Sequence, residues 1–149
     1  METTDTLNSV LRQKKPEVWS VTPETSVYDA LVLMANKQIG ALPVLSGSKL
    51  AGVFSERDYA RKVILMGRSS KETRIAEIMT APAISVTPEH TVDACMRLMT
   101  DHRVRHLPIV QDQKLIGIVS IGDLVNWIIT KQEETIHHLH EYIAGSYPG

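Results

Sequence analysis

The sequence predicts a mixed α/β (α+β) fold of two pseudo-symmetric β-α-β-β-α units that pack through their small sheets. Two observations support this prediction. The first is an internal repeat with a constant spacing of 65 positions, which aligns residues 20–24 with 85–89, 42–43 with 107–108 and 52–58 with 117–123. A single gap-free register is typical of a tandem pair rather than a solenoid. The second is that one unit alone would expose a face of its small sheet, which a second copy can bury.

An N-terminal helix is expected within residues 1–16, ahead of the first unit. Leu7, Val10 and Leu11 share one helical face, and the residues around Pro16 should end the helix. The first unit then spans 17–67 and alternates apolar extended segments with capped helices. Its expected elements are an extended segment at 18–22, a helix capped by Ser26, a hairpin of 40–45 with 50–54, and a helix from Ser55 to about Met66.

The second unit, 84–132, should repeat this order after a polar linker at 68–83 that holds a short helical turn near Ile75. Its expected elements are an extended segment at 84–87, a helix capped by Thr91, a hairpin of 105–110 with 115–119, and a helix from Ser120.

The last helix keeps apolar residues at helical spacing into a C-terminal tail over 133–149. Ile136, Leu139 and Ile143 belong to this stripe. We expect the helix to project beyond the core. Since exposed apolar stripes usually find a partner surface, we also expect a homodimer.

Composition places the chain among globular proteins without an electrostatic pull toward nucleic acid or membranes. Of its 149 residues, 43% are apolar and 22% charged, and the net charge is −1. No apolar run is long enough to span a bilayer and no signal peptide is recognisable, so a cytoplasmic location is expected. The one cysteine, Cys95, lies on an apolar helix face and should be a buried thiol.

Two Gly-x-x-Ser-x-x-Asp motifs, at 52–58 and 117–123, each place a strand end directly before a helix. A serine N-cap with an acid three residues later forms a capping box, which stabilises a helix without any ligand. The same position also offers backbone N–H groups to phosphate, and a first-turn carboxylate can accept hydrogen bonds from a ribose diol. Recurrence of the whole motif favours the ligand-binding interpretation, in which Gly52 and Gly117 leave room for adenine or ribose.

Taken together, the Ser-Val-Thr-Pro starts, the Leu-Pro strands and the two Gly-x-x-Ser-x-x-Asp turns resemble cystathionine-β-synthase (CBS) domains in a tandem pair, or Bateman module. The resemblance covers roughly residues 17–130. It implies two clefts between the units, each able to bind an adenosine compound such as AMP, ATP, NAD or S-adenosylmethionine. It also implies a disc-shaped dimer of such pairs.

The resemblance further implies a role for particular residues of each motif. Asp58 and Asp123 match the family's ribose-binding acids, and Ser55 and Ser120 match its phosphate-side hydroxyls. Backbone groups near Ser20 and Ile84 would meet an adenine edge.

The residue pair before each Leu-Pro also lines the clefts in this family, where basic residues hold phosphates. This pair is Gly40-Ala41 in the first unit and Arg105-His106 in the second. Arg57 could compensate for the missing basic pair. We expect His106 to serve the Asp58 cleft, and Arg105 with Ala41 to serve the Asp123 cleft.

Other kinds of site are less well supported. His137, His138, His140 and Glu141 could hold a metal, but no tetrahedral ligand set is complete, so a solvated helix tail is expected. A hydrolase built on Ser120, His106 and Asp123 would lack a nucleophile elbow, and we expect no enzymatic activity.

Two functions therefore remain. The first is a stand-alone regulatory module that binds an adenosine nucleotide, requires no other cofactor and signals energy or redox state to an unknown partner protein. The second is a scaffolding module with vestigial clefts.

Overall fold

The computed structural model describes residues 5–14 and 17–146, with side chains as far as His140. Each half contains an antiparallel hairpin flanked by helices, in the predicted order. The helices and strands are α1 (Leu7–Gln13), α2 (Val27–Lys37), β1 (Ala41–Ser46), β2 (Lys49–Ser55), α3 (Glu56–Tyr59), α4 (Val92–His102), β3 (His106–Gln111), β4 (Lys114–Ser120) and α5 (Ile121–Ser146). A π-type turn, Ala60–Ile64, follows α3, and a 3-10 turn, Ile75–Glu77, lies in the linker.

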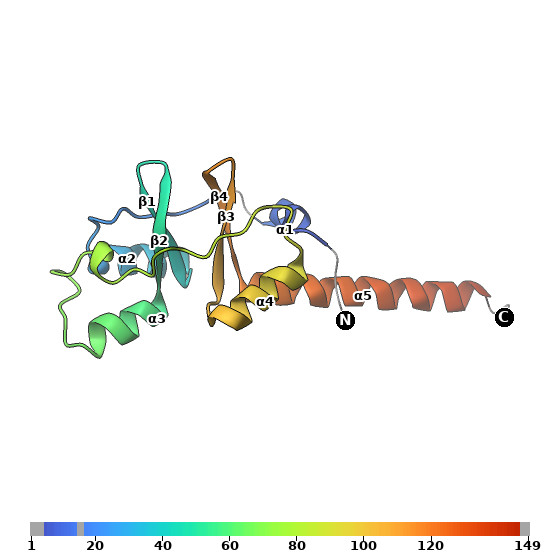
Figure 1. The fold of residues 1–149 in the computed structure, drawn as a ribbon. Helices are drawn as coiled ribbons and strands as arrows, with labels where there is room; N and C mark the ends of the chain where they lie inside the picture. The colour runs from blue at the N-terminus through green and yellow to red at the C-terminus, as the bar shows by residue number, and fades with distance from the viewer. Residues whose placement is uncertain (1–4, 15–16, 147–149) are drawn as a thin grey trace.

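The hairpins β1–β2 and β3–β4 match each other in register, including a bulge at the same place in each. They stand side by side at the centre of the molecule, and β2 contacts β4, so the two units do pack through their sheets (Figure 1). The predicted mixed helix-and-strand pair is therefore confirmed.

The extended segment that opens each unit forms a single parallel bridge rather than a third strand. Val21 bridges Val44, and Val86 bridges Ile109. A proline and a tight turn follow each segment, and Thr25 N already bonds Thr22 O in the first of them. Because proline cannot donate to a ladder, pairing stops after one residue, and the expected three-stranded sheets are two-stranded.

The predicted helix starts are confirmed, because Ser26 and Thr91 cap α2 and α4 through their side-chain oxygens. The helix after β2 is less regular than predicted, since α3 passes at Ala60 into the π-type turn. Its counterpart α5 is continuous and extends well past both hairpins (Figure 1). Ile136 and Leu139 on the projecting part are 54% and 55% exposed, which fits the predicted apolar stripe, while Ile143 lies outside the described side chains.

The segment that precedes each unit packs on the other unit. Leu7 and Val10 of α1 are buried in the core of the second unit, whereas Ile75 and Ile78 of the linker are buried in the core of the first. Leu7 N donates to His90 O as Ile75 N donates to Thr25 O. Each half is thus completed by chain that lies outside it in sequence.

This exchange also explains the two glycines of the repeated motif. A Cβ on Gly52 would lie 2.7 Å from the carbonyl oxygen of Thr80, and a Cβ on Gly117 would lie 3.1 Å from Leu11 Cδ2. The space beside each glycine is therefore filled by the linker or by α1. The expectation that these glycines leave room for adenine or ribose is wrong.

Candidate functional sites

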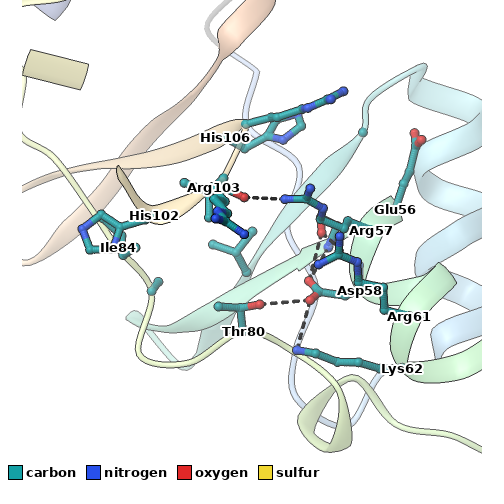
Figure 2. A pocket seen from close by; sticks show the side chains of 16 residues that line it. Glu56, Arg57, Asp58, Arg61, Lys62, Thr80, Ile84, His102, Arg103 and His106 are labelled. Carbon is teal, nitrogen blue, oxygen red and sulfur yellow. Dashed lines mark hydrogen bonds and ion pairs between the residues drawn. The ribbon is translucent and has the colours of Figure 1, made fainter. Parts of the chain in front are cut away.

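A cleft of about 730 Å3 lies between the two units at the N-terminus of α3, and we call it the Asp58 cleft (Figure 2). The first unit contributes the end of β2, α3 and the turn after it. The second unit contributes the residues before and at the start of β3, and the linker closes one side. The polar and charged residues that line it are Ser55, Glu56, Arg57, Asp58, Arg61, Lys62, Thr80, His102, Arg103, Arg105 and His106.

Both carboxylate oxygens of Asp58 already accept hydrogen bonds within the chain. Its Oδ2 accepts from Ser55 N at 2.9 Å and Ser55 Oγ at 3.0 Å, and the reciprocal bond from Asp58 N to Ser55 Oγ completes a capping box. Its Oδ1 accepts from Thr80 Oγ1 at 3.0 Å and forms an ion pair with Lys62 Nζ at 3.1 Å. The Asp58 side chain is only 10% exposed. A ribose could reach this carboxylate only by displacing Lys62 or Thr80.

Five cationic side chains surround the Asp58 cleft, and we call them the collar: Arg57, Arg61, Lys62, Arg103 and Arg105. Asp58 and Glu56 are the acids among the lining residues, so the formal charge is three positive. Arg57 Nη1 donates to Arg103 O at 2.5 Å and links the two units across the cleft (Figure 2). Such a field attracts a polyanion of nucleotide size.

Arg61, Lys62, Arg103 and Thr80 were not among the predicted site residues. Arg61 and Lys62 follow Asp58 at helical spacings of three and four, so a helix drawn from Ser55 could have placed them on the cleft side. Arg103 and Thr80 come from distant segments and carry no such signal.

His106 lies at the start of β3, beside the first unit. A Cβ on Gly40 would lie 3.3 Å from its Cε1, so the small residue at position 40 admits the imidazole. Burial lowers the pKa of His106 below its ordinary value, and the positive charges of Lys14 and Arg105 act in the same direction, while Asp123 opposes them. The ring is therefore predominantly neutral at pH 7.

A second cleft of about 600 Å3, which we call the Asp123 cleft, occupies the repeat-related position. Lys14, from the end of α1, donates from Nζ to Asp123 Oδ2 at 2.6 Å and to Ile118 O at 2.6 Å. Ser120 N also donates to Asp123 Oδ2. Burial alone would raise the pKa of Asp123, but the hydrogen bonds from Lys14 and Ser120 outweigh it and hold the pKa below its ordinary value.

The Asp123 cleft lacks the collar. The repeat places Gly122, Asn126, Trp127, Gln38 and Gly40 where the Asp58 cleft has Arg57, Arg61, Lys62, Arg103 and Arg105. Lys14 and Lys37 balance Glu17 and Asp123, and both tryptophans of the sequence, Trp19 and Trp127, form part of the wall. The two clefts thus share a shape but differ in charge.

The predicted site residues divide between the clefts as follows. Ser55, Arg57, Asp58, Ile84, Arg105 and His106 line the Asp58 cleft, and Asp123 lines the other. Ser120 caps α5, because its Oγ accepts from Asp123 N at 3.1 Å. Ala41 is 2% exposed within the core, and Ser20 is exposed beside Trp19, without lining either cleft.

The assignment of Arg105 and Ala41 to the Asp123 cleft is wrong. The hairpin expected from the sequence, 105–110 with 115–119, places Arg105 in the same strand as His106. The strand begins only at His106, and Arg103 just before it has a left-handed backbone with φ of 55°. Side chains alternate only within a strand, so Arg105 is free to share the Asp58 cleft with His106.

The described part of the chain also bears on metal binding, thiol reactivity and membrane-spanning helices. Its residues contain no group of three or more His, Cys, Asp or Glu able to hold a metal ion. Burial raises the pKa of the Cys95 thiol to about 11, which makes it unreactive. No helix within the described ranges is long and apolar enough to cross a membrane.

The two repeat-related units, each with its own hairpin and with a cleft at repeat-related positions, define a tandem-repeat module. The family model for the CBS domain matches residues 11–64 and 75–130. The chain therefore belongs to the CBS domain family, as a tandem pair.

Relatives support this assignment over nearly the whole chain. CBSX3, a CBS domain-containing mitochondrial protein of Arabidopsis thaliana, is 42% identical, and the alignment covers 95% of this chain and 73% of the relative. The structure of a CBS-domain protein from Burkholderia ambifaria MC40-6 is 52% identical, covers 85% of this chain and 96% of the other, and superposes with a TM-score of 0.82. The structure of CBSX2 in complex with AMP is 28% identical, covers 85% and 98% of the two chains, and has a TM-score of 0.70.

Proposed function

We propose that this chain is a non-catalytic regulatory module that binds an adenosine nucleotide, of the AMP, ATP or NAD type, in the Asp58 cleft and signals its presence to a partner protein. The observation that carries the proposal is the collar of five cations around that cleft. The AMP complex of CBSX2, which has the same fold, supports an adenosine ligand.

The collar matches the phosphate end of such a ligand. Arg57 and Arg61 come from the first unit, and Arg103 and Arg105 come from the second. A phosphate between them would join the units by charge-assisted hydrogen bonds, each contributing about 1.5–3 kcal/mol. A ligand that connects the units in this way can change their relative stability or position, which is the physical basis for signalling.

The ribose end requires an exchange at Asp58. Lys62 Nζ now forms an ion pair with Oδ1 of Asp58 and donates to the carbonyl oxygen of Ile78 at 3.0 Å. Because the Lys62 side chain is 43% exposed, water can replace both contacts when it turns away. A ribose hydroxyl then takes its place. The freed ammonium remains among the collar residues, where it can meet the phosphate. Lys62 thus moves from the acid to the ligand, and its charge stays neutralised in both states.

Titration calorimetry with AMP, ATP and NAD tests the proposal. The wild type should bind at least one of the three. The double variant Arg57→Gln/Arg61→Gln should bind that ligand at least roughly 100-fold more weakly, because two lost contacts of about 1.5 kcal/mol each amount to about 3 kcal/mol. The control is Lys49→Gln/Lys114→Gln, which removes the same charge from two exposed positions outside both clefts. Absence of wild-type binding, or equal losses in both variants, would contradict the proposal.

The absence of catalysis, the homodimer and the cytoplasmic location are part of the same proposal. Incubation with AMP, ATP or NAD should leave each nucleotide chemically unchanged. The exposed Ile136 and Leu139 on the projecting part of α5 offer an apolar surface to a second copy. Light scattering at micromolar concentration should therefore give a dimer mass. Cell fractionation should recover the chain with the cytoplasm, although the Arabidopsis thaliana relative is mitochondrial by name.

One observation favours the alternative function, a scaffolding module. Asp58 is saturated by intramolecular contacts, and a vestigial cleft would look the same. The calorimetric titration separates the two, because a scaffold would bind none of the three nucleotides.

A further inference from the structure

The N-terminal segment reaches into the Asp123 cleft and contacts the residue that matches the ribose acid. Lys14 Nζ lies 2.6 Å from Asp123 Oδ2 and 2.6 Å from the carbonyl oxygen of Ile118. The two side chains are 30% and 29% exposed, so the contact is partly shielded from water. The repeat does not conserve this lysine, because the spacing of 65 positions places Met79 at the equivalent position of the second copy.

Lys14 is held at this place by α1. Leu7 and Val10 of that helix are buried in the core of the second unit, at 0% and 4% exposed. The ammonium is therefore tethered close to Asp123 at a high effective concentration. A neutral ribose hydroxyl would have to replace a short ionic contact with a weaker neutral hydrogen bond.

Lys62 on Asp58 resembles Lys14 on Asp123, but the consequences differ. In the Asp58 cleft, the phosphate contacts of four arginines can offset the displacement of the lysine. In the Asp123 cleft, the positions equivalent to those arginines hold Gly122, Asn126, Gln38 and Gly40. A ligand that displaced Lys14 would therefore not gain phosphate contacts with four arginines in return.

From this asymmetry we infer that Lys14 keeps ribose off Asp123, so that the chain binds an adenosine nucleotide at only one of its two clefts. The inference rests on the proposed function, because ribose is the group that Asp123 would otherwise accept. Lys14 is thus a specificity-determining residue supplied by the end of α1. Without its ammonium, the Asp123 cleft becomes a site for an adenosine ligand that needs no phosphate collar.

The position of the two tryptophans makes the inference directly testable. Trp19 and Trp127 both line the Asp123 cleft and neither lines the Asp58 cleft, so tryptophan fluorescence, excited selectively over the four tyrosines, comes from the wall of the Asp123 cleft. The probe is adenosine, which carries no phosphate and therefore does not depend on the collar. We expect Lys14→Met to show a saturable change in tryptophan fluorescence with adenosine, at least tenfold tighter than any change in the wild type.

Two further variants locate the response. Lys37→Met removes the other lysine that lines the cleft, whose Nζ lies 4.0 Å from the Trp19 ring centroid, while leaving Lys14 on Asp123. It should respond to adenosine as the wild type does. Adding Asp123→Asn to Lys14→Met should abolish the new response. Circular dichroism confirms that each variant is folded, and Lys14→Gln replaces Lys14→Met if the latter is not.

The inference is overturned if the wild type and the Lys14 variant respond to adenosine with equal affinity, or if neither responds. It is also overturned if Lys37→Met opens the cleft as well. Failure of the proposed function has a different signature, namely no calorimetric binding of AMP, ATP or NAD to the wild type.

Discussion

Replacement of Asp58 by alanine should destabilise the fold more than the same change at Asp123. Asp58 accepts from Ser55 N, Ser55 Oγ and Thr80 Oγ1 and pairs with Lys62, and its side chain is 10% exposed. A net hydrogen bond contributes about 0.5–1.5 kcal/mol, and a half-exposed ion pair contributes less than about 1 kcal/mol. The expected loss for Asp58→Ala is therefore roughly 2–4 kcal/mol.

Asp123 accepts from Ser120 N and Lys14, and its side chain is 29% exposed. The same reasoning gives about 1–2 kcal/mol for Asp123→Ala. For a chain of this size, 1 kcal/mol corresponds to about 2–4 °C in melting temperature. The Asp58 variant should therefore melt several degrees below the Asp123 variant.

Urea titrations of both variants, followed by circular dichroism at one protein concentration and without ligand, measure this difference. Equal losses, or a larger loss for Asp123→Ala, would show that the contacts of Asp58 contribute little to stability. The deeper burial and the additional hydrogen bonds of Asp58 would then have no energetic consequence for folding.

Three further predictions concern substitutions or reactions at single positions. Affinity for AMP should strengthen as pH falls below about 6.5, the ordinary pKa of histidine, because a bound phosphate favours the protonated His106 ring. Burial lowers the pKa of this ring in the free chain. In calorimetric titrations at several pH values, His106→Gln should remove the contribution of the ring to the pH dependence and leave only that of the phosphate. Gly52→Ala should destabilise the fold because its Cβ would lie 2.7 Å from Thr80 O. Gly122→Ala, whose Cβ would lie 3.6 Å from Ser120 Oγ, should change the melting temperature little. Cys95, with a pKa of about 11, should react with a thiol reagent at pH 8 only at the rate of unfolding.

The repeat made most of the fold predictable. Helix caps at Ser26 and Thr91, and the hairpin turns, are local signals that tertiary packing did not override. The place of α1 was not predictable from the repeat. Leu7 and its counterpart Ile75 lie 68 positions apart, while the strands keep a spacing of 65, so the gap-free register hides their equivalence.

The site was predictable only where its residues belong to the motif itself. Ser55, Arg57 and Asp58 are adjacent in sequence, and the structure brings them into one cleft. Arg103 and Lys14 enter the clefts from segments remote in sequence, through a left-handed residue in one case and the end of α1 in the other. Contacts of that kind depend on how the two units pack, which no local pattern encodes.

A crystal structure of the chain grown with a saturating concentration of AMP tests the central claim most directly. We expect one nucleotide per chain, in the Asp58 cleft, with its phosphate among the collar arginines and its ribose on Asp58 in place of Lys62. Lys14 should remain on Asp123. A nucleotide bound at Asp123, or two clefts without nucleotide at that concentration, would contradict the account.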